Sequence, residues 1–132
     1  MKDAEAVAII REAVPDVVAI YRFGSTVRGG EHKASDVDLA FLAARPFDPV
    51  RRFELQERLA VTLRRDVDLV DLSAASTVMR MQVISRGLLL AVFDLPEKER
   101  FETYVYSSYA RLNEERKSIV EQVVRDGTVH GR

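Results

Sequence analysis

Two aspartates open a segment that is otherwise apolar. Asp36 and Asp38 stand at the start of the run from Val37 to Ala43, whose later residues are all apolar. Such a run predicts a strand that is covered on both faces at its far end. Two residues two apart on a strand project from the same face, about 7 Å apart at the backbone. Because charges at the start of a buried strand are costly unless something neutralises them, the fold must bring a neutralising group to this edge.

A glycine and a serine precede the aspartates at a fixed spacing. The β-branched and aromatic run Val17 to Phe23 predicts a buried strand that ends at Gly24, and ten residues separate Ser25 from Asp36. Glycine lets the backbone approach an anion closely, and a helix that began after Ser25 would direct free amides and its dipole toward a phosphate. The Ser25 hydroxyl adds a donor. The pattern predicts a phosphate site beside the carboxylates.

Carboxylate oxygens are natural ligands of magnesium, which completes its octahedron with water and substrate phosphates. Two such ions roughly 4 Å apart would stabilise the attacking and leaving oxygens of a phosphoryl displacement. A third carboxylate is expected from the strand predicted over Val67 to Leu72, and Asp68 is the chosen candidate. Asp66 shares its face, whereas Asp71 falls on the opposite face. A carboxylate at Asp68 could also deprotonate the attacking hydroxyl.

Helical and strand patterns alternate along the rest of the chain, which predicts an α+β or α/β fold with about four strands. The core is expected over about 1–95 of a single domain spanning 1–132, with a helical extension at about 97–125 and a frayed tail. The remaining predicted elements are helices over Ala4–Val14, from Phe53 to Leu63 after the breakers Pro46 and Pro49, and from Ser73 or Ser76 to about Ser85, and a strand over Leu88–Phe93.

The last predicted helix, Glu97 to about Arg125, is long for a domain of this size. At 1.5 Å per residue its roughly 28 residues span about 42 Å, against a domain width of about 35 Å. Part of its apolar stripe should therefore outrun the sheet and bind a partner protein or a second copy of the chain. The alternative is a bend near Ser107-Ser108 that gives two shorter helices, both packed on the core.

Composition narrows the function classes. The net charge is −1, with 20 basic residues interspersed among 21 acidic ones, so an extended nucleic-acid contact is not expected. Without cysteine, the chain has no disulfide, thiolate zinc site or thiol nucleophile. No apolar stretch approaches the roughly 18 residues that span a bilayer, and a cytoplasmic location is the expectation.

These residues resemble the minimal nucleotidyltransferases of the polymerase-β superfamily, of the MNT antitoxin type encoded beside HEPN-domain toxins. The resemblance implies a polymerase-β-like fold, with a mixed sheet of about four strands flanked by helices and a long C-terminal helix. Arg22 departs from the family pattern, which more often has an apolar residue there. The resemblance covers most of the chain and rests on Gly24-Ser25 with Asp36-x-Asp38, on Arg28-Gly29, on Val67-Asp68-Leu69-Val70-Asp71 and on the segment Ser85 to Leu90.

The resemblance also implies roles for the site. Gly24 and Ser25 would contact the triphosphate of ATP, Asp36 and Asp38 would bind two magnesium ions, and Asp68 would be the third carboxylate. The implied activity is transfer of AMP from ATP to a tyrosine hydroxyl of a HEPN ribonuclease toxin, which silences the toxin.

Several alternatives stay open at this stage. Arg28 is assigned to nucleotide binding as a bidentate phosphate clamp, but it could be a solvated loop residue. Asp68 could instead pair with Arg64 or Arg65 at the surface. His32 is read as an exposed loop residue. At the level of function, the chain could block its partner by occlusion without catalysis, or transfer a nucleotide to a small molecule.

Overall fold

The computed structural model describes residues 3–24 and 36–129, in which four strands form one sheet in the order β3-β2-β1-β4. β1 pairs antiparallel with both β2 and β4, while β2 pairs parallel with β3. The sheet is therefore mixed and four-stranded, as the sequence predicted. The strands are β1 (Val17–Phe23), β2 (Val37–Ala43), β3 (Val67–Asp71) and β4 (Leu88–Val92).

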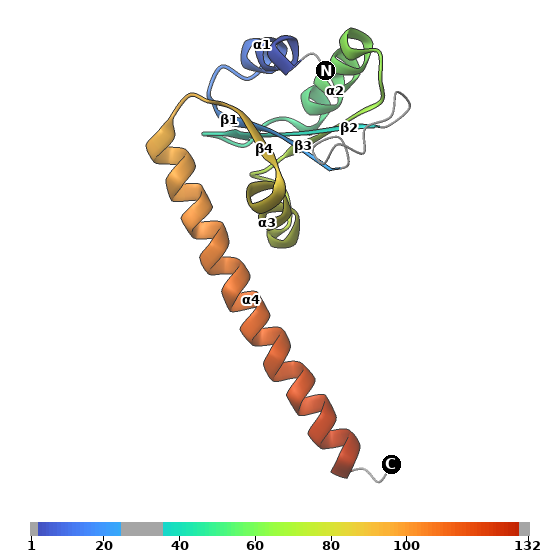
Figure 1. Cartoon of the computed structure of the whole chain (residues 1–132), viewed down its shortest axis with the longest axis vertical. Coiled ribbons are helices and arrows are strands. Elements are labelled where there is room, and N and C mark those ends of the chain that lie inside the picture. Colours follow the sequence, from blue (N-terminus) through green and yellow to red (C-terminus); the bar gives the residue numbers. More distant parts are fainter. Residues whose placement is uncertain (1–2, 25–35, 130–132) are drawn as a thin grey trace.

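Two helices cover each face of the sheet (Figure 1). α1 (Asp3–Ala13) and α2 (Pro49–Leu63) lie on one face, and α3 (Thr77–Arg86) and α4 (Leu95–Val129) begin on the other. β1 and β2 are central and lie almost entirely within the core, so their side chains are apolar toward both layers. Residues that alternate along one strand belong to different clusters: Ile20, Leu39, Phe41 and Leu69 pack toward α1 and α2, and Ala19, Tyr21, Phe23, Ala40, Leu42 and Leu72 pack toward α3 and α4.

The β3 edge of the sheet is closed by side chains from α2. The Leu69 amide donates to Gln56 Oε1 at 2.9 Å, and Arg52 Nη1 donates to the Leu69 carbonyl at 2.7 Å. These contacts satisfy backbone groups that an edge strand would otherwise present to another chain. β4, at the other edge, is more open, and Leu88 and Val92 are partly exposed there.

Helix boundaries follow their capping residues. Pro49, expected to break the chain, is the first residue of α2, because proline tolerates a helix start where its missing amide costs nothing. Asp48 caps this helix by accepting from the Val50 amide at 2.8 Å. α2 ends in a left-handed residue, Arg64, at φ 55°. Of the two serines proposed to start α3, Ser76 is the cap.

α4 is longer than the sequence predicted. It begins at Leu95 and continues without a break to Val129, so the bend near Ser107-Ser108 does not occur, and the expected frayed tail is helical as far as Val129. Its first turns are fastened to β1, since Tyr21 Oη donates to Glu102 Oε2 at 2.9 Å. Burial, and next the charge of Glu102, raise the pKa of Tyr21, so its hydroxyl stays protonated and donating.

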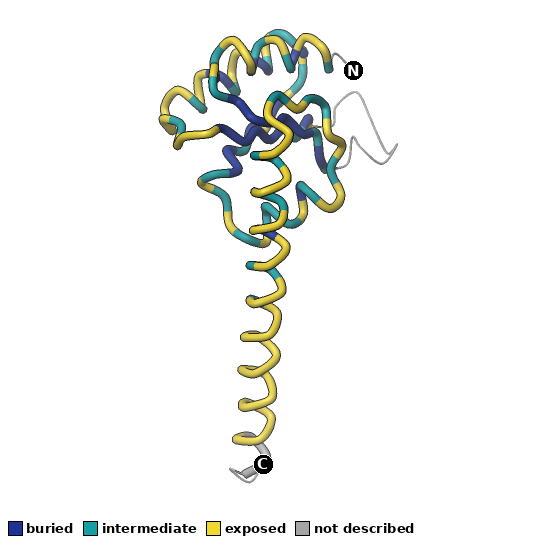
Figure 2. Tube along the Cα trace, turned by 90° about the vertical axis from the view of Figure 1, so that its left-hand side faces the viewer, coloured by how far each residue is buried: buried dark blue, intermediate teal, exposed yellow. Residues whose placement is uncertain are grey.

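The C-terminal part of α4 projects away from the rest of the fold (Figure 2). Val105 is fully buried, Leu112 is half-buried, and residues 113–126 are exposed. Among the described helices, including this one, none has the length and apolar character required to cross a lipid bilayer.

We expect the core to fold without the distal part of α4. Ending the chain at Leu112 removes residues 113–126, which are all exposed, so the free energy of unfolding should change by less than about 1 kcal/mol. Val105→Ala in the full chain is the contrasting variant and should cost about 2 kcal/mol, because it opens a cavity at a fully buried position. Denaturant unfolding followed by circular dichroism measures both, and global unfolding of the shortened chain would contradict the expectation.

Candidate functional site

The predicted carboxylates meet at one edge of the sheet. In the parallel pairing of β2 with β3, Asp38 lies directly opposite Asp68, and in the antiparallel pairing of β1 with β2 it lies opposite Phe23. Asp36 immediately precedes β2. Asp38 alternates with Ala40, which packs toward α3 and α4, so its side chain leaves the sheet on that face. Three carboxylates, Asp36, Asp38 and Asp68, thus lie along the border of the sheet where β1 ends and β2 and β3 begin. We call this border the carboxylate edge.

The electrostatics of this edge are unfavourable without a cation. Asp38 is half-buried, and its pKa is raised first by that burial and then by the negative charges of Asp68 and Asp36. Like charges gathered in a partly buried place oppose one another's ionisation. A divalent cation among them would remove the repulsion, and oxygen donors of this kind are those that magnesium prefers. The donor set therefore fits magnesium.

Gly24 is required by its backbone and by its neighbour. Its φ is 81°, a left-handed conformation that side chains disfavour. A Cβ built on it would overlap Asp38 Oδ2 and stand 3.0 Å from Asp38 Cγ. The end of β1 and the Asp38 carboxylate are therefore packed in direct contact. The approach predicted for Gly24 was toward a phosphate, which stays a prediction; the close approach seen here is toward the Asp38 carboxylate.

The phosphate-binding half of the prediction is not tested by the structure. Ser25, Arg28 and His32 lie outside the described residues. Within 3–24 and 36–129, no three histidine, aspartate or glutamate side chains gather closely enough to hold an ion by themselves. Magnesium does not need such a cage, because it keeps several waters and takes further oxygens from substrate phosphates.

The other two acids of the third strand have separate places. Asp66 is exposed at the same sheet edge, where its carbonyl accepts from the Val37 amide at 2.9 Å. Asp71 is buried at the far end of β3 and accepts from the Ser73 amide at 3.0 Å and from Ser73 Oγ at 2.7 Å. It orders the turn after the strand, in agreement with its exclusion from the predicted site.

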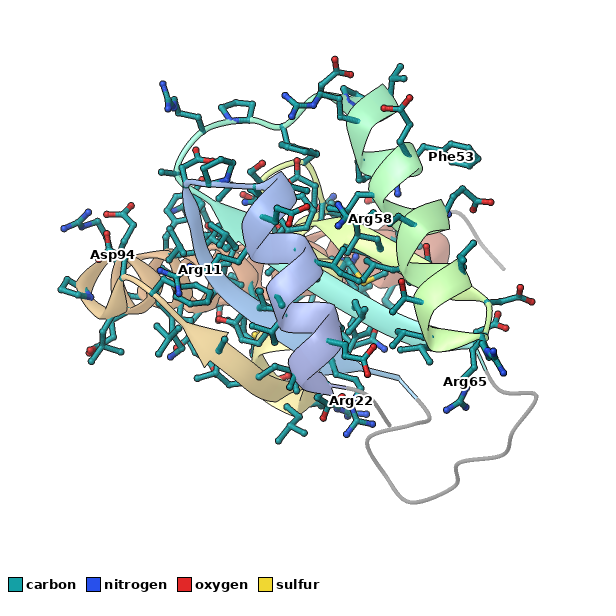
Figure 3. The ribbon with its side chains drawn as sticks, turned by 90° about the horizontal axis from the view of Figure 1, so that it is seen from above. Arg11, Arg22, Phe53, Arg58, Arg65 and Asp94 are labelled. Atoms are coloured by element: carbon teal, nitrogen blue, oxygen red, sulfur yellow. The ribbon has the colours of Figure 1, made fainter. Side chains whose placement is uncertain are left out.

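Arg22, the departure from the family pattern, faces away from the carboxylates. It lies beside the start of α1 (Figure 3), and its Nε is 3.4 Å from Asp3 Oδ1. Its neighbour Tyr21 packs toward α3 and α4, so Arg22 points to the opposite face from Asp38. The substitution is accommodated by this ion pair and leaves the signature residues untouched.

A cavity of about 350 Å³ at the other end of β2 was not foreseen from the sequence. Leu42, Arg80 and Phe101 are among the residues that line it. Arg80 donates to the carbonyls of Leu72 and Ser73, at 2.7 and 2.8 Å, and so holds α3 to the end of β3. Because Leu42 is four residues along β2 from Asp38, or about 13 Å, the cavity is separate from the carboxylate edge.

We expect Asp38→Asn to stabilise the metal-free protein at neutral pH. The pKa of Asp38 is raised above its ordinary 3.8, so the stability that its protonated form contributes is complete below that pH and is lost as pH rises through the folded value. The variant should therefore be more stable than the wild type above the folded pKa of Asp38, and this difference in stability should disappear near pH 3.5. Thermal unfolding in a chelator between about pH 3.5 and 7.5 measures the gain, with exposed Asp66→Asn as control. A variant less stable than wild type at pH 7 would contradict the expectation.

A double-mutant cycle tests the contact between Gly24 and Asp38. Gly24→Ala should cost about 1–3 kcal/mol, partly from its φ and partly from overlap with the carboxylate. In an Asp38→Ala background the overlap disappears, so the cost should fall by roughly 1 kcal/mol. Denaturant unfolding of the four proteins gives the interaction energy, and strictly additive costs would show that the two residues do not touch.

Comparison with known proteins agrees with this geometry. The sequence family described as "Polymerase beta, Nucleotidyltransferase" matches residues 5–94. The protein adenylyltransferase MntA of Shewanella oneidensis is 38% identical over 124 residues, which cover 94% of this chain and 88% of the relative.

Two solved structures resemble the fold closely. A crystal structure described as a toxin-antitoxin with AMP-PNP is similar with a TM-score of 0.85 and 38% identity, covering 94% of this chain and 99% of that one. The structure of an MNT antitoxin in complex with a tri-AMPylated Shewanella oneidensis HEPN toxin is similar with a TM-score of 0.77 and 36% identity. The match covers 92% of this chain and 95% of that one. The predicted fold and family are confirmed: this chain belongs to the polymerase beta nucleotidyltransferase family and, within it, to the minimal nucleotidyltransferases of the MntA type.

Proposed function

We propose that this protein transfers AMP from ATP to a tyrosine hydroxyl of a HEPN-domain ribonuclease toxin and thereby acts as its antitoxin. Support comes from the relative named a protein adenylyltransferase, from the related complex whose HEPN toxin carries AMP, and from the related structure that holds an ATP analogue. We place the reaction in the cytoplasm, where ATP, magnesium and the RNA targets of a ribonuclease are found.

The observation that carries the proposal is the position of Asp38, opposite Asp68 and in contact with Gly24. Asp36 and Asp38 would each bind two magnesium ions, and Asp68 would complete the set of carboxylates. Magnesium, when bound, supplies positive charge that stabilises the phosphates and the leaving pyrophosphate. Gly24 and Ser25 would receive the triphosphate at the end of β1, with Arg28 as a further clamp.

The chemistry is an in-line displacement at the α-phosphorus of ATP. A new bond forms between the tyrosine oxygen and the α-phosphorus, and the bond from that phosphorus to the oxygen bridging to the β-phosphate breaks. Pyrophosphate leaves with that bridging oxygen. Because a phenol has a pKa of about 10, a base is needed at neutral pH, and the exposed Asp68 carboxylate would accept the proton.

Two other functions use the same fold. A binding protein could block the toxin by occlusion alone, but it has no need of a half-buried Asp38 whose pKa is raised by burial and then by two neighbouring carboxylates. Transfer to a small molecule is disfavoured because the relative that matches this chain over 124 residues is named a protein adenylyltransferase.

The deciding experiment incubates this protein with the HEPN-domain protein encoded beside it, ATP and magnesium. Mass spectrometry should then show added AMP on a toxin tyrosine, whereas an unmodified toxin that is nevertheless inhibited would establish occlusion.

We expect Asp36→Asn and Asp38→Asn each to abolish AMP transfer while the protein stays folded, because each removes a ligand charge. Ser25→Ala should be milder, with about a tenfold loss, since one neutral hydrogen bond to phosphate is worth about 1 kcal/mol. Initial rates with radiolabelled ATP at saturating toxin measure all three variants.

The size of the serine effect has a separate meaning. A Ser25→Ala variant as inactive as Asp38→Asn would show that Ser25 does more than donate one bond. Wild-type rates in the Asp36→Asn, Asp38→Asn double variant would overturn the two-metal proposal.

A further inference from the structure

The apolar face of α4 continues after the fold has ended. Val105 packs in the core, and Leu112 and Ile119 follow at intervals of seven residues, nearly two full turns. Phe101 and Val123 lie four residues before and after this series, so all five residues share one side of the helix. The side that packs on the core near its start is therefore exposed to solvent near its end. We call the exposed part, Ile119, Val120, Val123 and Val124, the distal stripe.

The distal stripe is exposed and has the character of a packing surface. Ile119 is 62% exposed and Val123 is 63% exposed, with Val120 and Val124 beside them at 60% and 62%. Single exposed apolar residues are common on proteins, but four within six positions form a patch. All four are β-branched, a class that loses side-chain freedom in a helix, so helix propensity does not explain them.

The phase of the stripe determines which way it faces. Because Ile119 lies in line with Val105, the stripe looks to the side of α4 on which the sheet and α3 lie. In Figure 1 that side opens onto the space below α3, beside the sheet face that α3 covers. Asp38 leaves the sheet on this same face. A partner seated on the stripe would thus lie on the catalytic side of the molecule.

The comparisons favour the toxin over a second copy as occupant. The match to the nucleotidyltransferase family ends at Asp94, one residue before α4 begins. The likeness to MntA and to the toxin-antitoxin structure extends over 94% of the chain, which requires most of α4. The helix is therefore an addition to the catalytic unit that this chain shares with toxin-partnered relatives. The charges beside the stripe are mixed, with Lys117 and Arg125 against Glu121 and Asp126, so apolar contact dominates recognition.

We infer that the distal stripe of α4 is the docking surface for the HEPN toxin, on which a complementary apolar helical face of the toxin packs so that its acceptor tyrosine is held near the carboxylate edge. This inference rests on the proposed function for the identity of the partner. It assigns acceptor recognition to α4 and chemistry to the sheet edge, two regions that substitutions can separate.

The test compares two double variants of the full chain. Ile119→Asp with Val123→Asp places two charges in the stripe. Ser118→Asp with Gln122→Asp places two aspartates, also four residues apart, at exposed positions on the side of the helix away from the centre of the stripe. Both pairs change the net charge by −2 relative to this sequence, so they differ in the face that is altered. The stripe variant should bind the neighbouring HEPN-domain protein at least about 100-fold more weakly in calorimetry and show a raised KM for it, whereas the control should change either value less than about threefold.

Binding of AMP-PNP with magnesium, and helix content by circular dichroism, should be unchanged in both variants. Unaltered toxin binding by the stripe variant would overturn the inference. The inference would also be overturned if light scattering showed a dimer for the wild type and a monomer for the stripe variant alone, while toxin binding persisted. The stripe would then join two copies of this chain. If the complex depends on the stripe but no AMP is transferred, the docking inference stands and the proposed function falls.

Discussion

The repulsion among three carboxylates at one sheet edge is the constraint on which this structure turns. Asp38 faces Asp68 across two parallel strands and has Asp36 two residues before it. Burial, and then the negative charges of these two neighbours, raise its pKa. The fold holds these groups together through the apolar remainder of β2, which is buried in both layers of the core. Hydrophobic burial thus supports an arrangement that electrostatics opposes and that a divalent cation would relieve.

The same face of the sheet anchors the helix that leaves the fold. Tyr21 lies two residues before Phe23, the strand partner of Asp38, and its hydroxyl holds Glu102 in the first turns of α4. Val105 completes the attachment by burying its side chain. A helix that is fixed at one end and exposed at the other sets the direction of its distal stripe relative to the carboxylate edge, because an unbroken helix is stiff over this length.

Periodicity and punctuation were sufficient for most of the fold. β1 and β2 match their predicted bounds because each apolar run has a clear signal at one end: Gly24 directly follows β1, and the aspartates stand at the start of β2. The predicted helix boundaries were wrong where a residue or segment is compatible with two local structures. Pro49 breaks a helix from within but also favours its first position, and only the Asp48 cap shows which applies. The end of α4 was placed too early because a solvated, mixed-charge segment reads equally well as helix or as tail.

For the site, the sequence alone predicted which residues would carry the chemistry, since Gly-Ser and Asp-x-Asp at this spacing have few other uses. Tertiary structure decided what no spacing contains: that β2 and β3 are parallel neighbours whose register sets Asp38 against Asp68, and that Gly24 has no room for a side chain because the Asp38 carboxylate occupies it. It also decided that Arg22 faces α1 and that the distal stripe of α4 is exposed. Local patterns report the preferences of a segment, whereas strand pairing, contact and exposure depend on segments distant in the chain.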